Sequence, residues 1–353
     1  MKNFIPEKKE NRSINENIDI LCDVLEEEII KSDTDESSKK VMLKNLRTLY
    51  NTETNIMLVG ATGCGKSSTI NALFVCSHPK EAEDDGYVEI AKVGSKAEPE
   101  TKDIERYRIG NLTLWDTPGL GDGTEIDLHH KEVIEELLRE EDAEGNALID
   151  LVLVILDGSA KDLGTSYKIL NNVIIPELRD DTNRILIALN QADIAMKTGR
   201  HWDYENNKPD ETLKKFLDEK VKSIKQRIWT ESGIEINPVY YCAGYKEESG
   251  DRVYPYNISK LLLYLLNAMP ARKRMAVIKG INDDPEVYQY NDDETDYKEE
   301  MKSSFDDMTT CIADGINNGA VIGHAILGVP GMVVGCVAGG IVGFIHGIFD
   351  SIF

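Results

Sequence analysis

The stretch that decides the fold reads Gly60-Ala61-Thr62-Gly63-Cys64-Gly65-Lys66-Ser67-Ser68, which fits the pattern G-x-x-x-x-G-K-[ST]. Its glycines let the backbone curl so that successive N–H groups face one concavity, which suits phosphate oxygens. Lys66 can reach the outer phosphates, and Ser67 can offer its hydroxyl to Mg²⁺. The residues predicted to contact bound phosphate are Gly60, Gly63, Gly65, Lys66, Ser67 and Ser68.

The flanks of this loop support the same interpretation. Residues 55–59 form a short apolar run typical of a buried strand, and residues 68–74 have apolar side chains at helical spacing. Strand, glycine loop and helix therefore follow in the order that a phosphate loop requires, and the start of a helix also attracts anions. A glycine-rich turn without a ligand would not need these flanks.

Composition limits the possible partners and the compartment. The chain has 353 residues, is 41% hydrophobic and carries a formal net charge of -23. Such an acidic chain is repelled by nucleic acid, so we expect no DNA partner. The six cysteines form no C-x-x-C pair, and the first residues lack the apolar run of a signal peptide, so we expect a cytoplasmic protein without a zinc site or disulfide framework.

A second motif lies about fifty residues after the loop. Gly110-Asn111 separates two strand-like runs, which predicts a β-hairpin that ends in Asp116-Thr117-Pro118-Gly119. Together, the loop and this D-T-P-G run resemble the translation-factor-related GTPases, particularly the Era-like and TrmE-like bacterial groups. The loop is also similar to that of dynamin-like and immunity-related GTPases.

This resemblance implies a Mg²⁺-dependent protein that binds GTP and GDP. Asp116 would hold Mg²⁺ through water, together with Ser67 and Thr101, where Thr101 is the candidate switch threonine. The backbone N–H of Gly119 would bind the γ-phosphate, and Lys66 would neutralise the β- and γ-phosphates. Lys66, Thr101 and Gly119 are therefore the predicted catalytic residues.

The following segments alternate between strands and helices, as a mostly parallel α/β sheet requires. Strands are predicted over residues 149–156, 184–189 and 235–241. Helices are predicted over residues 167–175, 211–228 and 259–269.

Two strand ends carry residues that resemble a guanine site. Asn190-Gln191-Ala192-Asp193 is similar to the N-K-x-D motif, with Gln191 in place of lysine. The resemblance implies that Asp193 accepts two hydrogen bonds from guanine, which adenine cannot offer. Cys242-Ala243-Gly244 is similar to the S-A-K loop, in which the alanine N–H contacts the base.

The remaining residues are assigned by composition. Two amphipathic stretches near the N-terminus predict a helical hairpin packed on the main domain, and a mostly acidic run after residue 281 predicts a loop-like linker. The predicted segments are an N-terminal helical segment (1–50), a G domain (51–270), a charged linker (271–308) and a hydrophobic tail (309–353).

The tail has an unusual pattern. No Asp, Glu, Lys or Arg occurs between Asp314 and Asp350, and glycine recurs at every fourth position in two blocks. Such spacing places the glycines on one helix face, as in a glycine zipper, and Pro330 lies between the blocks, so a helical hairpin is predicted. Three roles remain open: membrane contact through residues 315–349, oligomerisation, or a hairpin buried against the protein.

Two functions remain open from the sequence. The first is a GTPase that hydrolyses slowly on its own, because Leu120 stands where Ras-type enzymes have the glutamine that orients water. Gly63 also stands where potassium-activated relatives have asparagine, so a second copy or another partner would supply the missing group. The alternative is a nucleotide-gated membrane or assembly module that does not hydrolyse GTP.

Overall fold

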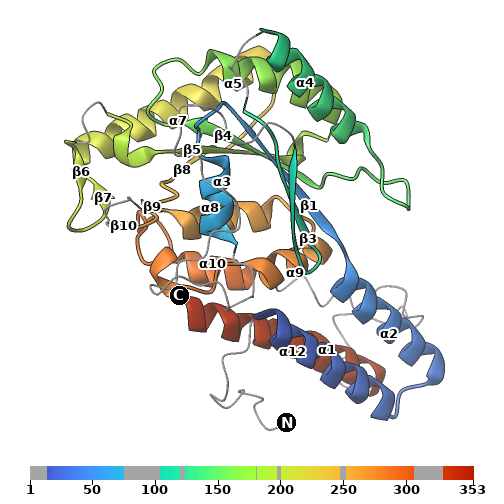
Figure 1. Cartoon of the computed structure of the whole chain (residues 1–353). Coiled ribbons are helices and arrows are strands. Elements are labelled where there is room, and N and C mark those ends of the chain that lie inside the picture. The colour runs from blue at the N-terminus through green and yellow to red at the C-terminus, as the bar shows by residue number, and fades with distance from the viewer. Residues whose placement is uncertain are drawn as a thin grey trace.

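The computed structural model describes residues 14–74, 104–119, 124–179, 181–196, 200–246, 252–305 and 329–353. Its centre is a six-stranded sheet in the order β2-β3-β1-β4-β5-β8 (Figure 1). Every pairing is parallel except β2 with β3. This confirms the predicted α/β fold. The strands are β1 (Thr54–Gly60), β2 (Glu105–Ile109), β3 (Leu112–Asp116), β4 (Leu151–Asp157), β5 (Ile185–Asn190) and β8 (Val239–Tyr240).

Helices cover both faces of the sheet (Figure 1). The alternation of side chains along β1 divides the core: Met57 and Val59 join one apolar cluster, while Ile56 and Leu58 join the other. The helices of the first cluster are α4 (Thr124–Arg139), α5 (Gly164–Ile169), α6 (Ile175–Leu178) and α7 (Glu211–Ser232). Those of the second include α3 (Lys66–Leu73), α8 (Ile258–Asn267) and α9 (Ala271–Gly280).

Two predicted elements differ from the structure. The helix predicted over residues 167–175 is longer, because a π-helical turn at Leu170–Ile174 joins α5 to α6. The strand predicted over residues 235–241 is shorter, since only Val239 and Tyr240 pair with β5. Pro238 directly before them has no N–H to donate, which explains why the ladder does not extend further back. Two short antiparallel pairs complete the strands: β6 (Trp202–Asp203) with β7 (Lys208–Pro209), and β9 (Tyr245–Lys246) with β10 (Arg252–Val253).

Below the sheet, helices from both ends of the chain pack together (Figure 1). We call α1 (Ile14–Lys31), α2 (Glu36–Asn51), α9 and α12 (Val329–Ile352) the helical base. The Asp35 carboxylate caps α2 by accepting a 3.0 Å hydrogen bond from the Ser38 N–H. The two predicted N-terminal helices therefore form, and their buried side chains include Ile18, Leu25, Ile29, Met42, Leu46 and Leu49.

The segment predicted as a charged linker, residues 271–308, contains two helices that pack into the core, while residues 281–296 between them include only a short 3-10 turn, Pro285–Val287. Residues 271–280 form α9, whose Met275, Val277 and Ile278 are buried in the core. A second helix, α10 (Tyr297–Ser303), buries Met301. The basic residues of α9 also take part in the packing, because Lys273 Nζ lies 2.9 Å from Asp150 Oδ1. Apolar residues spaced between the charges decide this outcome.

Of the three roles left open for the tail, the described residues show packing against the protein. The apolar face of α12 points inward, with Val337, Ile341, Ile345 and Phe349 buried. Gly339, Gly343 and Gly347 point outward: a Cβ added to any of them would meet no described atom within 4 Å. Residues 309–328, the predicted first arm, lie outside the described residues. Within the described part of the chain, no helix is long and apolar enough to cross a membrane.

Candidate functional site

The phosphate loop joins the end of β1 to the start of α3 and depends on its glycines. Gly63 and Gly65 have φ of +75° and +92°, where a side chain would be strained. A Cβ on Gly60 would lie 2.4 Å from the carbonyl oxygen of Ile155 on β4, so the first glycine permits a close approach of two strands. The helix begins at Lys66, and Ser68 lies in its first turn.

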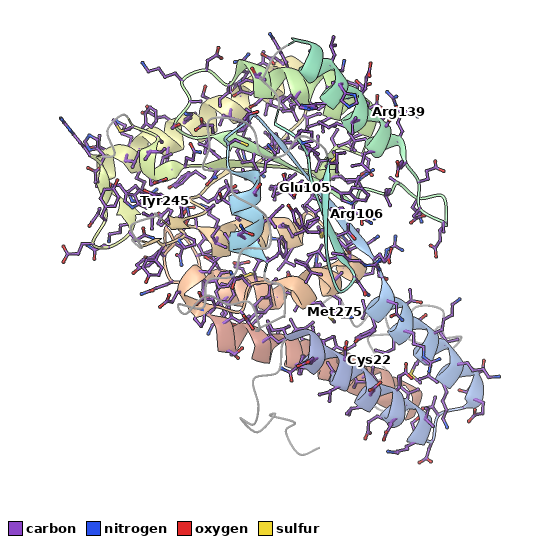
Figure 2. All side chains as sticks on the ribbon, viewed as in Figure 1. Cys22, Glu105, Arg106, Arg139, Tyr245 and Met275 are labelled. Carbon is purple, nitrogen blue, oxygen red and sulfur yellow. The ribbon has the colours of Figure 1, made fainter. Side chains whose placement is uncertain are left out.

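Ser67 and Asp116 meet at the centre of this region. The Ser67 hydroxyl donates a 2.8 Å hydrogen bond to Asp116 Oδ2. Asp116 is fully buried, and its Oδ1 has no hydrogen-bond partner among the described residues. Burial raises the pKa of Asp116 despite the nearby positive charge of Lys66, and Glu105, labelled on β2 in Figure 2, raises it further.

This arrangement fits a hard cation. A carboxylate oxygen and a hydroxyl are the ligands that Mg²⁺ prefers, and the free lone pairs of Oδ1 would gain a partner. A cation there would also favour the ionised carboxylate. Ser67 and Asp116 are thus brought together as predicted, whereas Thr101 lies outside the described residues.

Gly119 lies directly against the phosphate loop. A Cβ on this residue would be 2.3 Å from Thr62 Oγ1 and 2.6 Å from the Thr62 nitrogen. Thr117 fixes the approach, since its hydroxyl donates a 2.7 Å bond to the Leu58 carbonyl on β1. His130 Nδ1 lies 3.1 Å from the Gly119 carbonyl oxygen. The sequence analysis did not identify His130. The signal for its burial was its helical spacing to the apolar Ile134 and Leu137.

The Asn190 side chain, at the end of β5, hydrogen-bonds two loops. Its Nδ2 donates a 3.0 Å bond to the Cys64 carbonyl in the phosphate loop, and its Oδ1 accepts a 3.0 Å bond from the Ala243 N–H. Gln191 adds a second tie, because its Nε2 donates a 2.9 Å bond to the Gly63 carbonyl. Ser159 in turn donates to Gln191 Oε1 at 3.3 Å. Gln191, which replaces the usual lysine, thus binds the phosphate loop through an uncharged amide.

Asp193 and Cys242 are both buried close to these hydrogen bonds. Burial raises the pKa of the Asp193 carboxyl, and its interaction with the Cys242 thiol opposes that rise. The backbone of Cys242 is held by two hydrogen bonds to Tyr256, at 3.0 and 2.9 Å. Lys220, which the sequence did not single out, donates a 2.8 Å bond to the Ala160 carbonyl and supports the loop that carries Ser159.

Residues 55–191 match the family model described as 50S ribosome-binding GTPase. Interferon-gamma-inducible GTPase 10 of Mus musculus is 39% identical over 71 residues, which is 19% of this chain and 15% of that relative. Toc33 from Arabidopsis thaliana, solved with Mg²⁺ and GMPPNP, is 17% identical with a TM-score of 0.36, over 71% of this chain and 97% of its own. A bacterial dynamin from an oligomerised pair is 17% identical with a TM-score of 0.40, over 86% of this chain and 57% of its own.

Proposed function

We propose that this chain, whose residues 55–191 belong to a GTPase-family G domain, binds GTP and GDP with Mg²⁺ and hydrolyses GTP to GDP and phosphate. The observation that carries the proposal is the Asn190 side chain, which hydrogen-bonds the phosphate loop and the Ala243 loop at once. A ligand that spans both loops has phosphates at one end and a flat polar base at the other. The Era-like or TrmE-like subgroup remains a prediction.

At the phosphate end, each residue has a distinct proposed role. Lys66 neutralises phosphate charge, and the Gly119 N–H donates to the γ-phosphate as charge develops there. Ser67, Asp116 and Thr101 would hold Mg²⁺, which when bound offsets the negative charge on the phosphate oxygens. Because Asp116 is buried, its carboxylate keeps a fixed position relative to Ser67.

At the base end, specificity is proposed to rest on Asp193. Its buried carboxylate would accept two hydrogen bonds from guanine. The Ala243 N–H is occupied by Asn190, so Ala243 acts on the base only if that bond is exchanged or shared. Gln191 would lay its stem along the base while its amide keeps hold of Gly63.

Calorimetric titration of the full chain with GDP, GMPPNP and ADP, with Mg²⁺ and with EDTA, tests the proposal. We expect both guanine nucleotides to bind, ADP to fail, and EDTA to weaken GMPPNP binding. The Lys66→Ala variant is the control for the site, and equal binding of GDP and ADP would end the assignment. Phosphate release per molecule should be slow and should rise with protein concentration if a second copy supplies the group that Leu120 lacks.

A second candidate function is a nucleotide-gated module in which the tail is released toward a membrane or a second copy. The packing of α12 favours it, because its buried apolar face is the kind of surface that associates when uncovered. An ion pair and a ring contact help to hold α12 against the protein. Lys302 Nζ lies 2.7 Å from Asp350 Oδ1, and the centroid of the Phe353 ring lies 4.4 Å from that of Tyr288. Tyr288 in turn donates to the carbonyl of Asn282, whose N–H donates to the Leu73 carbonyl at the end of α3.

Liposome flotation and size-exclusion chromatography with GDP and with GMPPNP test this candidate. We expect association in one nucleotide state, and its loss in a Gly335→Leu/Gly339→Leu double variant with unchanged GTP affinity. A chain that stays monomeric and never floats, in either nucleotide state, rules the candidate out.

A further inference from the structure

We propose that His130 is a positioning residue for the GTP-bound state: it holds the Gly119 carbonyl and so keeps the Gly119 backbone beside the phosphate loop, where the Gly119 N–H can reach the γ-phosphate. The inference rests on the proposed function, since Gly119 has this role only if the site binds GTP. His130 itself would touch neither nucleotide nor metal.

The contact between the two residues is a directed hydrogen bond. His130 Nδ1 lies 3.1 Å from the Gly119 carbonyl oxygen, and the ring is 6% exposed. A carbonyl oxygen only accepts, so the hydrogen must sit on Nδ1. The bond therefore places a hydrogen on Nδ1, and it satisfies both the carbonyl oxygen and that ring nitrogen.

Gly119 needs such an anchor more than another residue would. Glycine leaves both of its backbone dihedrals free, so the path of its backbone is poorly defined on its own. Thr62 limits the position of the Gly119 Cα from the side of the phosphate loop, where an added Cβ would lie 2.5 Å from the Thr62 Cα. His130 holds the carbonyl from the other side. Together they hold the Cα and the carbonyl of Gly119. The Gly119 N–H belongs to the preceding peptide unit, where the Pro118 ring fixes φ and the Thr117 hydroxyl is bonded to the Leu58 carbonyl.

The surroundings of His130 argue that the ring is there for this bond. On α4 it shares a face with Ile134, Leu137 and Leu138, which are all buried in the apolar core. An aliphatic side chain would fill this position without the cost of burying a polar ring. The polar partner that the structure provides for the ring is the Gly119 carbonyl.

The consequence is a link between α4 and the terminal phosphate. A Gly119 backbone held in place in advance loses less conformational freedom when GTP binds, so His130 should favour GTP over GDP. GDP has no γ-phosphate for the Gly119 N–H, and its affinity should not depend on the histidine.

Three variants test this with GMPPNP and GDP as probes. His130→Met fills the core but cannot donate, and we expect it to weaken GMPPNP binding about 3- to 10-fold with GDP affinity unchanged. His130→Asn carries a donor nitrogen at the place of Nδ1, and we expect it to restore most of the GMPPNP affinity. The control is His129→Ala, the exposed neighbour on the same helix, which should change neither affinity.

The outcomes separate the possibilities. Equal losses for GMPPNP and GDP, or an unchanged ratio in His130→Met, would overturn the inference and leave a structural core histidine. Failure of His130→Asn to recover the ratio while its unfolding midpoint matches that of the wild type would also overturn it. If the wild-type chain binds no GMPPNP at all, the proposed function itself has failed instead.

Discussion

At the carboxyl edge of the sheet, the loops are held by hydrogen bonds from side chains to backbone atoms, whereas the helical base is held by buried aliphatic side chains. Asn190, Gln191 and Thr117 each reach a carbonyl oxygen on another segment. In the base, Ile29, Met42 and Ile345 are fully buried. Hydrogen bonds fix directions, which a binding site needs, while apolar burial supplies stability with little directional demand.

The glycines of the two regions show the same contrast most clearly. In the site, Gly60 and Gly119 are required because a Cβ would collide with backbone atoms. In α12, Gly343 meets nothing described within 4 Å, and glycine there only lowers helix propensity. One residue type is thus a geometric necessity in one region and a cost in the other.

The largest expected effect is at the site. Asp193→Asn removes a double acceptor, so we expect guanine nucleotide affinity to fall about 1,000-fold and xanthosine nucleotides, which carry a carbonyl in place of the amine, to gain affinity. Calorimetric titration measures both. The exposed Glu205→Gln is the charge-matched control and should bind as the wild type does. Unchanged GDP affinity in Asp193→Asn would show that the base is not read here.

In the helical base, Ile345→Ala should lower the free energy of unfolding by about 2 to 4 kcal/mol, because it removes buried methyl groups and leaves a cavity. Urea unfolding followed by circular dichroism measures this. The matched control is Ile30→Ala on α1, which is 56% exposed and should change stability by less than about 0.5 kcal/mol. Similar losses of unfolding free energy in the two variants would contradict the burial of Ile345 in the helical base.

A charge buried in the base should make its stability depend on pH. Burial lowers the pKa of Lys279 from 10.5 to about 8, more than the attraction of Asp19 raises it. Between these values the unfolded chain binds more protons than the folded one, so this residue's contribution to stability increases as pH rises from about 8 to about 10.5.

Comparison with Lys279→Met isolates that contribution. We expect wild-type stability, relative to the variant, to improve by about 2 kcal/mol between pH 7 and pH 10. Urea unfolding at both pH values measures the difference. Met loses the 3.0 Å bond to the Tyr50 carbonyl at either pH, so that loss cancels in the comparison. A constant difference would mean that Lys279 is not desolvated.

The smallest effect concerns the open glycine face of α12. Gly343→Ala should raise the free energy of unfolding by about 0.5 to 1 kcal/mol, since alanine is the better helix former. Gly340→Ala should gain less, because its Cβ would lie 3.2 Å from Leu25 Cδ2 and the leucine would have to shift. Thermal unfolding can resolve the two. Destabilisation by Gly343→Ala would indicate that another segment packs closely on this face, as a glycine zipper requires.

Local sequence determined the order of strands and helices in the sheet domain and most of the residues of its site. The strand, glycine loop and helix around Lys66 follow from backbone conformations that few other residues allow, and the residues ending β3 and β5 meet at one edge because parallel strands align their carboxyl ends. The contacts of Ser67 with Asp116 and of Asn190 with the phosphate loop were therefore foreseeable in outline.

Only the tertiary structure decided what the flanking segments do. Composition suggested a charged linker over residues 271–308 and left three roles open for the tail, whereas in the structure Met275 and Ile341 lie in one core with Cys22 and Leu46. His130 likewise gains its partner from Gly119, eleven residues away along the chain. A composition records how much apolar surface a segment has, but which distant segment covers that surface depends on packing between helices from both ends of the chain.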